Sequence, residues 1–175
     1  MSSPGSAGGQ FDADAGFKGA QFKTTTRLGP LRANILVLDG ASFGASIVVE
    51  VAAARLSLVG ARFEQEATLW VRYADVVLDA AGFTKPASLS FAETPFTLRV
   101  PVVAAGQDLT LDETPLEQAR LPAQPRLLSL RRVDTSNLVL GDLDLAWCLF
   151  RGAHNLDKLR IGGPKHFGTT PKLAF

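Results

Sequence analysis

The chain has 175 residues, a formal net charge of +1 and 20% charged residues, which fits one globular domain with a buried core. It has no apolar run near the roughly 18 residues that a membrane-spanning helix needs. A single cysteine, Cys148, excludes an internal disulfide framework and fits a reducing compartment, so we expect a cytoplasmic protein with no membrane segment in this chain.

The first ten residues are small and polar, and we expect residues 1–10 to form a disordered tail. They lack the basic and apolar regions of a signal peptide. From residue 11 the chain enters a loosely repeating segment in which Phe11, Phe17 and Phe22 mark inward positions.

A ten-residue pattern then returns every twenty residues, at 34–43, 54–63 and 74–83. When the three blocks are stacked, the same kinds of residue align in four columns. These columns are Leu36, Leu56 and Val76; Leu38, Leu58 and Leu78; Ala41, Ala61 and Ala81; and Phe43, Phe63 and Phe83. A fixed period of this length is typical of solenoids, in which each turn buries its face against its neighbours.

Within each block the apolar residues alternate, which indicates short strands of about three to five residues rather than helices. Small residues such as Gly40 and Gly60 follow the apolar pairs and allow a corner. The sequence therefore predicts an all-β fold, a parallel β-helix (β-solenoid) with about 20 residues per turn.

The block 94–103 is expected to continue the columns, with Phe96 under Val76, Leu98 under Leu78 and Val103 under Phe83. From 104 to 126 the period is lost in a proline-punctuated, acidic stretch. We interpret 104–126 as an insertion that leaves the coil as a solvated loop, with a short helical turn at 115–120.

The period returns at 127 as residues spaced five apart. The expected inward positions are Leu128, Val133, Leu138, Leu143, Cys148 and Ala153. We expect the last coils at 127–158, one β-helix domain over 11–163 with regular coils at 34–103, and a C-terminal tail at 164–175.

The units SNLVL and GDLDL, within 136–155, resemble the five-residue consensus of the pentapeptide-repeat family. The chain also looks like the C-terminal part of longer actinobacterial pentapeptide-repeat proteins, in which stretches similar to CLFRGAHNLDKLRI recur. The resemblance implies a right-handed quadrilateral β-helix with four five-residue sides per turn.

The best understood members of that family mimic B-form DNA and bind type II topoisomerases, so the resemblance implies a regulator of a DNA-handling enzyme as an alternative function. DNA mimicry needs a field of one sign. The regular coils instead mix acidic residues such as Glu50, Glu64 and Asp79 with basic ones such as Arg55 and Arg72. The balanced charge disfavours this alternative and makes nucleic acid an unlikely partner.

Cross-turn neighbours follow from the period. Arg55 should lie beside Asp75 as a surface ion pair, and Asp134 beside His154. A Cys–His–Asp arrangement with Cys148 is conceivable, but Cys148 points inward and His154 outward, so we expect an inert thiol.

Other candidate sites are weak. The chain has two histidines and no phosphate-binding glycine motif, and the basic strip of Arg131, Arg132, Arg151 and Lys158 is ordinary for a solvated edge.

Trp70 and Arg72 alternate with inward Leu69 and Val71, and Tyr73 follows at a corner. Exposed Trp, Tyr and Arg are enriched in binding hot spots, so these three are our candidate partner-binding residues. The equal alternative is that the insertion folds back and covers them.

We therefore expect a non-enzymatic structural scaffold or protein–protein interaction module, without a catalytic set, cofactor, metal or small-molecule substrate. Its partner would be another protein or a second copy bound through an open coil end, where unpaired backbone needs a cap.

Overall fold

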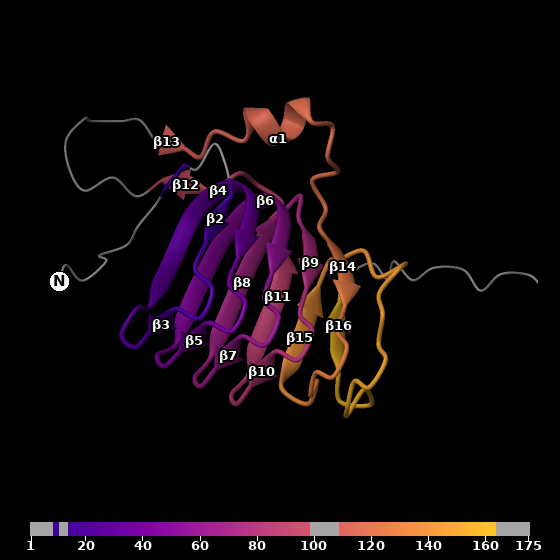
Figure 1. Cartoon of the computed structure of the whole chain (residues 1–175). Coiled ribbons are helices and arrows are strands. Elements are labelled where there is room, and N and C mark those ends of the chain that lie inside the picture. The colour runs from indigo at the N-terminus through magenta and orange to yellow at the C-terminus, as the bar shows by residue number, and fades with distance from the viewer. Residues whose placement is uncertain (1–8, 11–13, 99–108, 164–175) are drawn as a thin grey trace, which may run out of the picture.

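A computed structural model describes residues 9–10, 14–98 and 109–163, and its architecture is a parallel β-solenoid (Figure 1). Strands of neighbouring turns pair in parallel, and their partner residues lie twenty positions apart through the regular part: Val49 pairs with Leu69, and Leu69 with Leu89. The predicted fold class is confirmed. Gly9 and Gln10, which the sequence places in the N-terminal tail, form a short strand β1 that pairs in parallel with Leu31 and Arg32.

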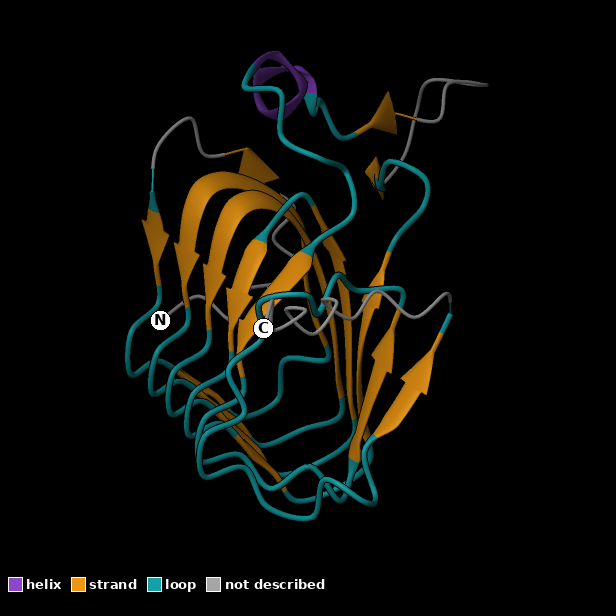
Figure 2. Ribbon diagram, turned by 90° about the vertical axis from the view of Figure 1, so that its right-hand side faces the viewer, coloured by secondary structure: helices purple, strands orange, loops and turns teal. Residues whose placement is uncertain are grey.

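Two walls and a base make up each turn (Figure 2). Wall A contains the first halves of β4 (Arg27–Val37) and β6 (Ile47–Ser57), then β8 (Ala67–Arg72), β11 (Ala87–Phe91), β15 (Leu138–Gly141) and β16 (Arg160–Gly162). Wall B contains β2 (Ala15–Gly16), the second halves of β4 and β6, β9 (Asp75–Val77) and β14 (Arg126–Ser129). The base contains β3 (Gln21–Phe22), β5 (Ser42–Phe43), β7 (Arg62–Phe63) and β10 (Gly82–Phe83).

The two walls are joined differently in different turns. β4 and β6 are continuous 11-residue strands that arch from wall A to wall B, so the expected limit of three to five residues is wrong for them (Figure 2). In β6 the arch falls at Ala52–Ala53–Ala54, whose small side chains leave room for the bend. In the next turn the strand breaks at Tyr73, which has a positive φ of 66°.

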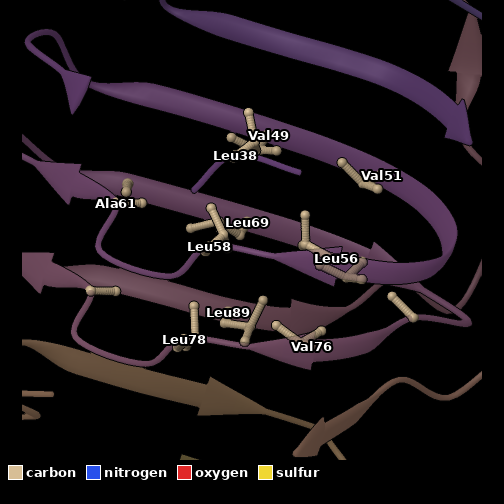
Figure 3. Close-up of a cluster of buried hydrophobic side chains, with 14 of the residues drawn as sticks. Leu38, Val49, Val51, Leu56, Leu58, Ala61, Leu69, Val76, Leu78 and Leu89 are labelled. Atoms are coloured by element: carbon tan, nitrogen blue, oxygen red, sulfur yellow. The ribbon is translucent and has the colours of Figure 1, made fainter. Parts of the chain in front are cut away.

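The predicted interior columns are confirmed. Leucine and valine side chains of the two walls meet inside the coil (Figure 3), and the four aligned columns are all buried. At the base, the rings of Phe22, Phe43, Phe63 and Phe83 stack nearly parallel, with centroid separations of 4.9, 4.7 and 5.2 Å. Because each ring covers its neighbours in the turns above and below, this column spans four turns of the coil.

Corners of the coil need a left-handed backbone. Gly40 and Gly60 take φ values of 65° and 67° there, and Ala80 occupies the same position of the third block with φ 55°. Glycine adopts this conformation without a steric cost, whereas alanine has a Cβ that crowds the following carbonyl. The third repeat therefore carries local strain that the first two avoid.

We predict that Ala80→Gly raises the unfolding free energy by about 0.5–1 kcal/mol, because relief of the left-handed strain exceeds the extra entropy of glycine in the unfolded chain. Ala80 is exposed, so its methyl group contributes little packing. The matched reverse change, Gly60→Ala, should cost about 1 kcal/mol. Urea unfolding of both variants measures the effect, and a loss of stability in Ala80→Gly would contradict the corner geometry.

The insertion leaves the coil after β11 and returns at β14. Leu127 pairs with Val76, and the side chain of Arg126 reaches Asp75, 51 residues earlier instead of 20. Between them lie β12 (Thr97–Leu98) and β13 (Leu109–Thr110), which pair antiparallel, and α1 (Thr114–Gln118), which agrees with the expected helical turn. All three elements lie above the arch of the coil (Figures 1 and 2).

The expectation that 94–103 continues the columns is therefore wrong for Phe96 and Leu98, while Val103 lies outside the described residues. Phe96, Leu111 and Leu116 form a second small core with Ala52 and Tyr73 on the outside of the coil. The apolar side chains of the insertion are therefore buried in this outer core and not in the interior of the coil. The chain leaves the coil about ten residues earlier than the sequence suggests.

The final coils follow the predicted five-residue spacing except at their start. Leu127 and Leu130 are fully buried and Leu128 is half-buried, because the pairing of β14 with β9 shifts register between Leu127 and Ser129. Val133, Leu138 and Leu143 are buried as expected, whereas Cys148 and Ala153, the last two predicted inward positions, are half-buried. In the described part of the chain no helix has the length and apolar character needed to cross a membrane.

Candidate binding groove

One row of side chains runs across the outside of wall A. Glu50 pairs in register with Trp70, Trp70 with Ser90, and Ser90 with Gly141. Their neighbours Val49, Leu69, Leu89 and Leu140 fill the interior, so strand alternation places the row on the outer surface. Adjacent members are about 4.8 Å apart, the spacing of paired strands.

This row borders a hollow of about 720 Å³, which we call the wall A groove. Its other lining comes from Arg27 on β4, from the segment 91–97 at the start of the insertion, and from Asp142 after β15. A volume of this size is typical of ligand sites. The groove lies between the wall A sheet and the start of the insertion, and its lining comes from parts of the chain far apart in sequence.

The three candidate residues from the sequence are separated by the structure. Trp70 is 39% exposed and lines the groove, whereas Arg72 and Tyr73 are each only 5% exposed. The insertion covers these two, as one of the two alternatives anticipated. Trp70 thus remains available to a partner, and Arg72 and Tyr73 have a structural role.

Arg72 ties the insertion to wall A. Its Nε donates to Glu113 Oε2 at 2.8 Å, and a terminal nitrogen donates to the carbonyl of Ala92 at 2.6 Å. The guanidinium carbon lies 5.3 Å from the Tyr73 ring centroid and 5.9 Å from that of Phe91, within cation–π range. Burial raises the pKa of the Tyr73 hydroxyl, against the lowering effect of its hydrogen bond from Arg72.

The charges around the groove are unequal. Arg27 donates from a terminal nitrogen to Glu50 Oε1 at 2.6 Å, and the carboxylates of Glu93 and Asp142 also belong to the lining. Three buried atoms of these residues have no hydrogen-bond partner within the described part of the chain: Arg27 Nε, Glu50 Oε2 and Asp142 Oδ1. The lining therefore holds three carboxylates and one guanidinium.

Cys148 does not have the features of a nucleophile. It is half-buried against the main core, and desolvation raises the pKa of its thiol to about 12, so the thiolate is scarce at neutral pH. His154 is exposed, as expected. The conceivable Cys–His–Asp arrangement thus lacks a reactive thiolate.

Asp134 and His154 do face each other on adjacent turns, as predicted. Asp134 Oδ1 accepts from the Ser136 backbone N–H at 3.0 Å, from Asn155 Nδ2 at 2.9 Å and from the Ser136 hydroxyl at 2.7 Å. These hydrogen bonds, with a smaller contribution from His154, lower the Asp134 pKa to about 2. Through its hydrogen bond from Asn155, the Asp134 carboxylate links two adjacent turns of the last coils.

We predict that Asp134→Asn makes the unfolding free energy depend less on pH in the acid range. The folded pKa lies below the ordinary value, so the carboxylate stabilises the fold above about pH 4, and this contribution disappears as the pH falls from about 4 to about 2. The stability difference between wild type and Asp134→Asn should shrink over that range. Thermal melts at several pH values measure it, with exposed Asp157→Asn as control, and a pH-independent difference would contradict the assignment.

The predicted Arg55–Asp75 ion pair and the predicted basic strip differ in the structure. Arg55 and Asp75 are register partners, but Asp75 accepts two hydrogen bonds from Arg126, at 2.7 and 2.8 Å. In the expected basic strip, Arg131 binds Asp79 at 2.6 Å. Burial opposes ionisation of Asp79, but hydrogen bonds from Ser129 and Arg131 outweigh it and lower the pKa. Arg131 is therefore largely neutralised rather than part of a free cationic edge.

The sequence missed most of the groove. Glu50, Trp70 and Ser90 are spaced by twenty, so their common outer row could have been found from the repeat. Asp142 and Gly141 could not, because the insertion changes the offset. No family model, curated protein or solved structure matches the chain. Within the described ranges, no group of three or more His, Cys, Asp or Glu side chains is arranged to hold a metal ion.

Proposed function

We propose that this protein is a non-enzymatic β-solenoid module that binds another protein through the wall A groove. Its solenoid acts as the scaffold, and the groove contacts an exposed segment of the partner. The single cysteine fits action in the reducing cytoplasm.

The observation that carries this proposal is the position of Trp70. Its partly exposed indole stands in the middle of a stacked row, held by β6 on one side and β11 on the other. An aromatic side chain on a rigid sheet loses little conformational entropy when it is covered, and such residues dominate binding hot spots. The groove beside it gives a partner a concave surface to fill.

We further propose that the chain is a divergent member of the pentapeptide-repeat family. The twenty-residue turn and the five-residue spacing of Val133, Leu138 and Leu143 support this relation. The DNA-mimic alternative gains no support, because acidic side chains of the coil such as Asp75 and Asp79 are paired with arginines.

A selection experiment tests the proposed function. Random peptides displayed on phage would be selected on the wild-type protein and counter-selected on Trp70→Ala, with Trp147→Ala as the matched control. Trp147 is 78% exposed and lies outside the groove lining, so its loss should leave the selected peptides bound.

We expect an enriched peptide set that binds the wild type and Trp147→Ala but not Trp70→Ala. The proposal fails if no peptides are enriched, or if the enriched peptides bind Trp70→Ala as tightly as the wild type. Circular dichroism of the Trp70→Ala protein confirms that its fold is retained.

A further inference from the structure

Resting on the proposed function, we infer that the wall A groove recognises a basic side chain, a lysine or arginine presented by an extended peptide segment. The ligand class follows from three features of the lining: its charge, its exposed indole and its small floor residues. The proposed function already rests on the indole of Trp70, whereas the charge and the small floor residues are additional observations.

The charge of the lining favours a cation. Arg27 is already engaged by Glu50, so the guanidinium and one carboxylate offset each other. Glu93 and Asp142 leave an excess of negative charge, and neither makes an ion pair in the described part of the chain. Of the three buried lining atoms without a hydrogen-bond partner in the described part of the chain, Glu50 Oε2 and Asp142 Oδ1 are acceptors and Arg27 Nε is a donor, so acceptors predominate.

Trp70 supplies the second feature. The face of an indole attracts ammonium and guanidinium groups more strongly than any other aromatic side chain. Glu50 is its register partner on β6, about 4.8 Å away along the sheet. Because Arg27 already pairs with Glu50, a cation over the exposed part of the ring would combine cation–π attraction with Coulomb attraction to the Glu93 and Asp142 carboxylates of the same lining.

The floor beyond Trp70 is low. Ser90 and Gly141 continue the row with a small side chain and none, and a Cβ added to Gly141 would lie only 2.5 Å from Ser90 Oγ. This flat stretch leads to Asp142 and leaves space for the main chain of a ligand beside the indole. The lining holds three carboxylates and one guanidinium, so a purely apolar side chain would leave the excess negative charge without a partner.

Titration of a single-tryptophan protein tests the inference. Trp147→Phe leaves Trp70 as the only tryptophan, so its fluorescence reports on the groove. The probes are three synthetic peptides of the form acetyl-Gly-Ser-Gly-Xaa-Gly-Ser-Gly-amide, with lysine, norleucine or glutamate as Xaa. We expect saturable changes with the lysine peptide only, and weaker binding at high salt.

Matched variants locate the interaction, with binding followed by NMR. Trp70→Leu should weaken binding of the lysine peptide by about 2- to 30-fold. Glu93→Gln should weaken it by about 2- to 5-fold. Ser90→Lys places a competing cation in the row and should abolish binding, while Ser88→Lys, one pleat away on the same strand and outside the lining, should not.

Equal binding of the norleucine or glutamate peptide, or no binding of the lysine peptide, would overturn the inference. Phage-selected peptides that require Trp70 but carry no basic residue would overturn it as well, while leaving the proposed function intact. Failure of both experiments would remove both proposals.

Discussion

Replacing Glu113 with alanine should destabilise the docked insertion by about 3–5 kcal/mol, because it leaves the Arg72 guanidinium buried without its counter-charge. The two side chains are 6% and 2% exposed, and their contact is 2.8 Å long. Arg72 also holds the Ala92 carbonyl, where the chain leaves the coil. Urea unfolding measures the global effect, and exchange of the Leu111 amide, which donates to the Phe96 carbonyl, reports undocking of the insertion.

A double-mutant cycle separates the ion pair from its surroundings. Removing both charges with Arg72→Met and Glu113→Leu should cost less than the sum of the single changes, since no unpaired charge stays buried. Additive effects, or a loss below about 0.5 kcal/mol in Glu113→Ala, would show that the pair does not hold the insertion. Undocking also removes the 91–97 side of the groove, so Glu113→Ala should weaken peptide binding as well.

Phe63→Ala should lower the unfolding free energy by about 3–5 kcal/mol, because it opens a cavity in the middle of the phenylalanine column. The Phe63 ring is 1% exposed and stacks on Phe43 and Phe83 at 4.7 and 5.2 Å. The loss includes aromatic stacking on both faces. Denaturant unfolding measures it.

Position in the column provides the control. Phe22, at the described N-terminal end of the stack, is half-buried and has one stacked neighbour, so Phe22→Ala should cost clearly less than Phe63→Ala. Phe63→Leu, which retains most of the apolar volume, should also cost less. Equal losses for Phe22→Ala and Phe63→Ala would contradict a column that is continuous through Phe63.

The solenoid could be predicted because its interior repeats itself. Leu38, Leu58 and Leu78 occupy equivalent places in successive turns, so one periodic pattern specifies both the strand alternation and the pairing register. The same logic located the Asp134–His154 contact. Where every turn is alike, local sequence and tertiary structure carry the same information.

The insertion could not be predicted in the same way, because its core is not periodic. Phe96 matches an interior column by spacing, yet it packs against Tyr73 and Leu111 outside the coil. Which of two apolar environments it enters depends on contacts with residues beyond the break in the repeat. The register shift that buries Leu127 in place of Leu128 has the same origin, since it follows the return of the chain to wall B.

The candidate site contains residues whose environment the repeat predicts and residues whose environment it does not predict. Alternation along β8 correctly placed Trp70 on the outer surface, because that inference needed only its own strand. The fate of Arg72 depended on Glu113, forty-one residues later and in the insertion. The groove itself requires strands on both sides of the insertion, so the repeat alone could not assemble it.

The central structural claim is that wall A continues across the insertion, so that β11 pairs with β15 and completes the floor of the groove. Methyl–methyl nuclear Overhauser effects in a leucine-labelled sample test this most directly. Leu89 and Leu140 are register partners inside the coil, and we predict a strong cross-peak between them, with another between Leu89 and Leu69. An uninterrupted twenty-residue period would instead place Leu109 beside Leu89. A Leu89–Leu109 cross-peak without the Leu89–Leu140 one would contradict the fold and the groove built on it.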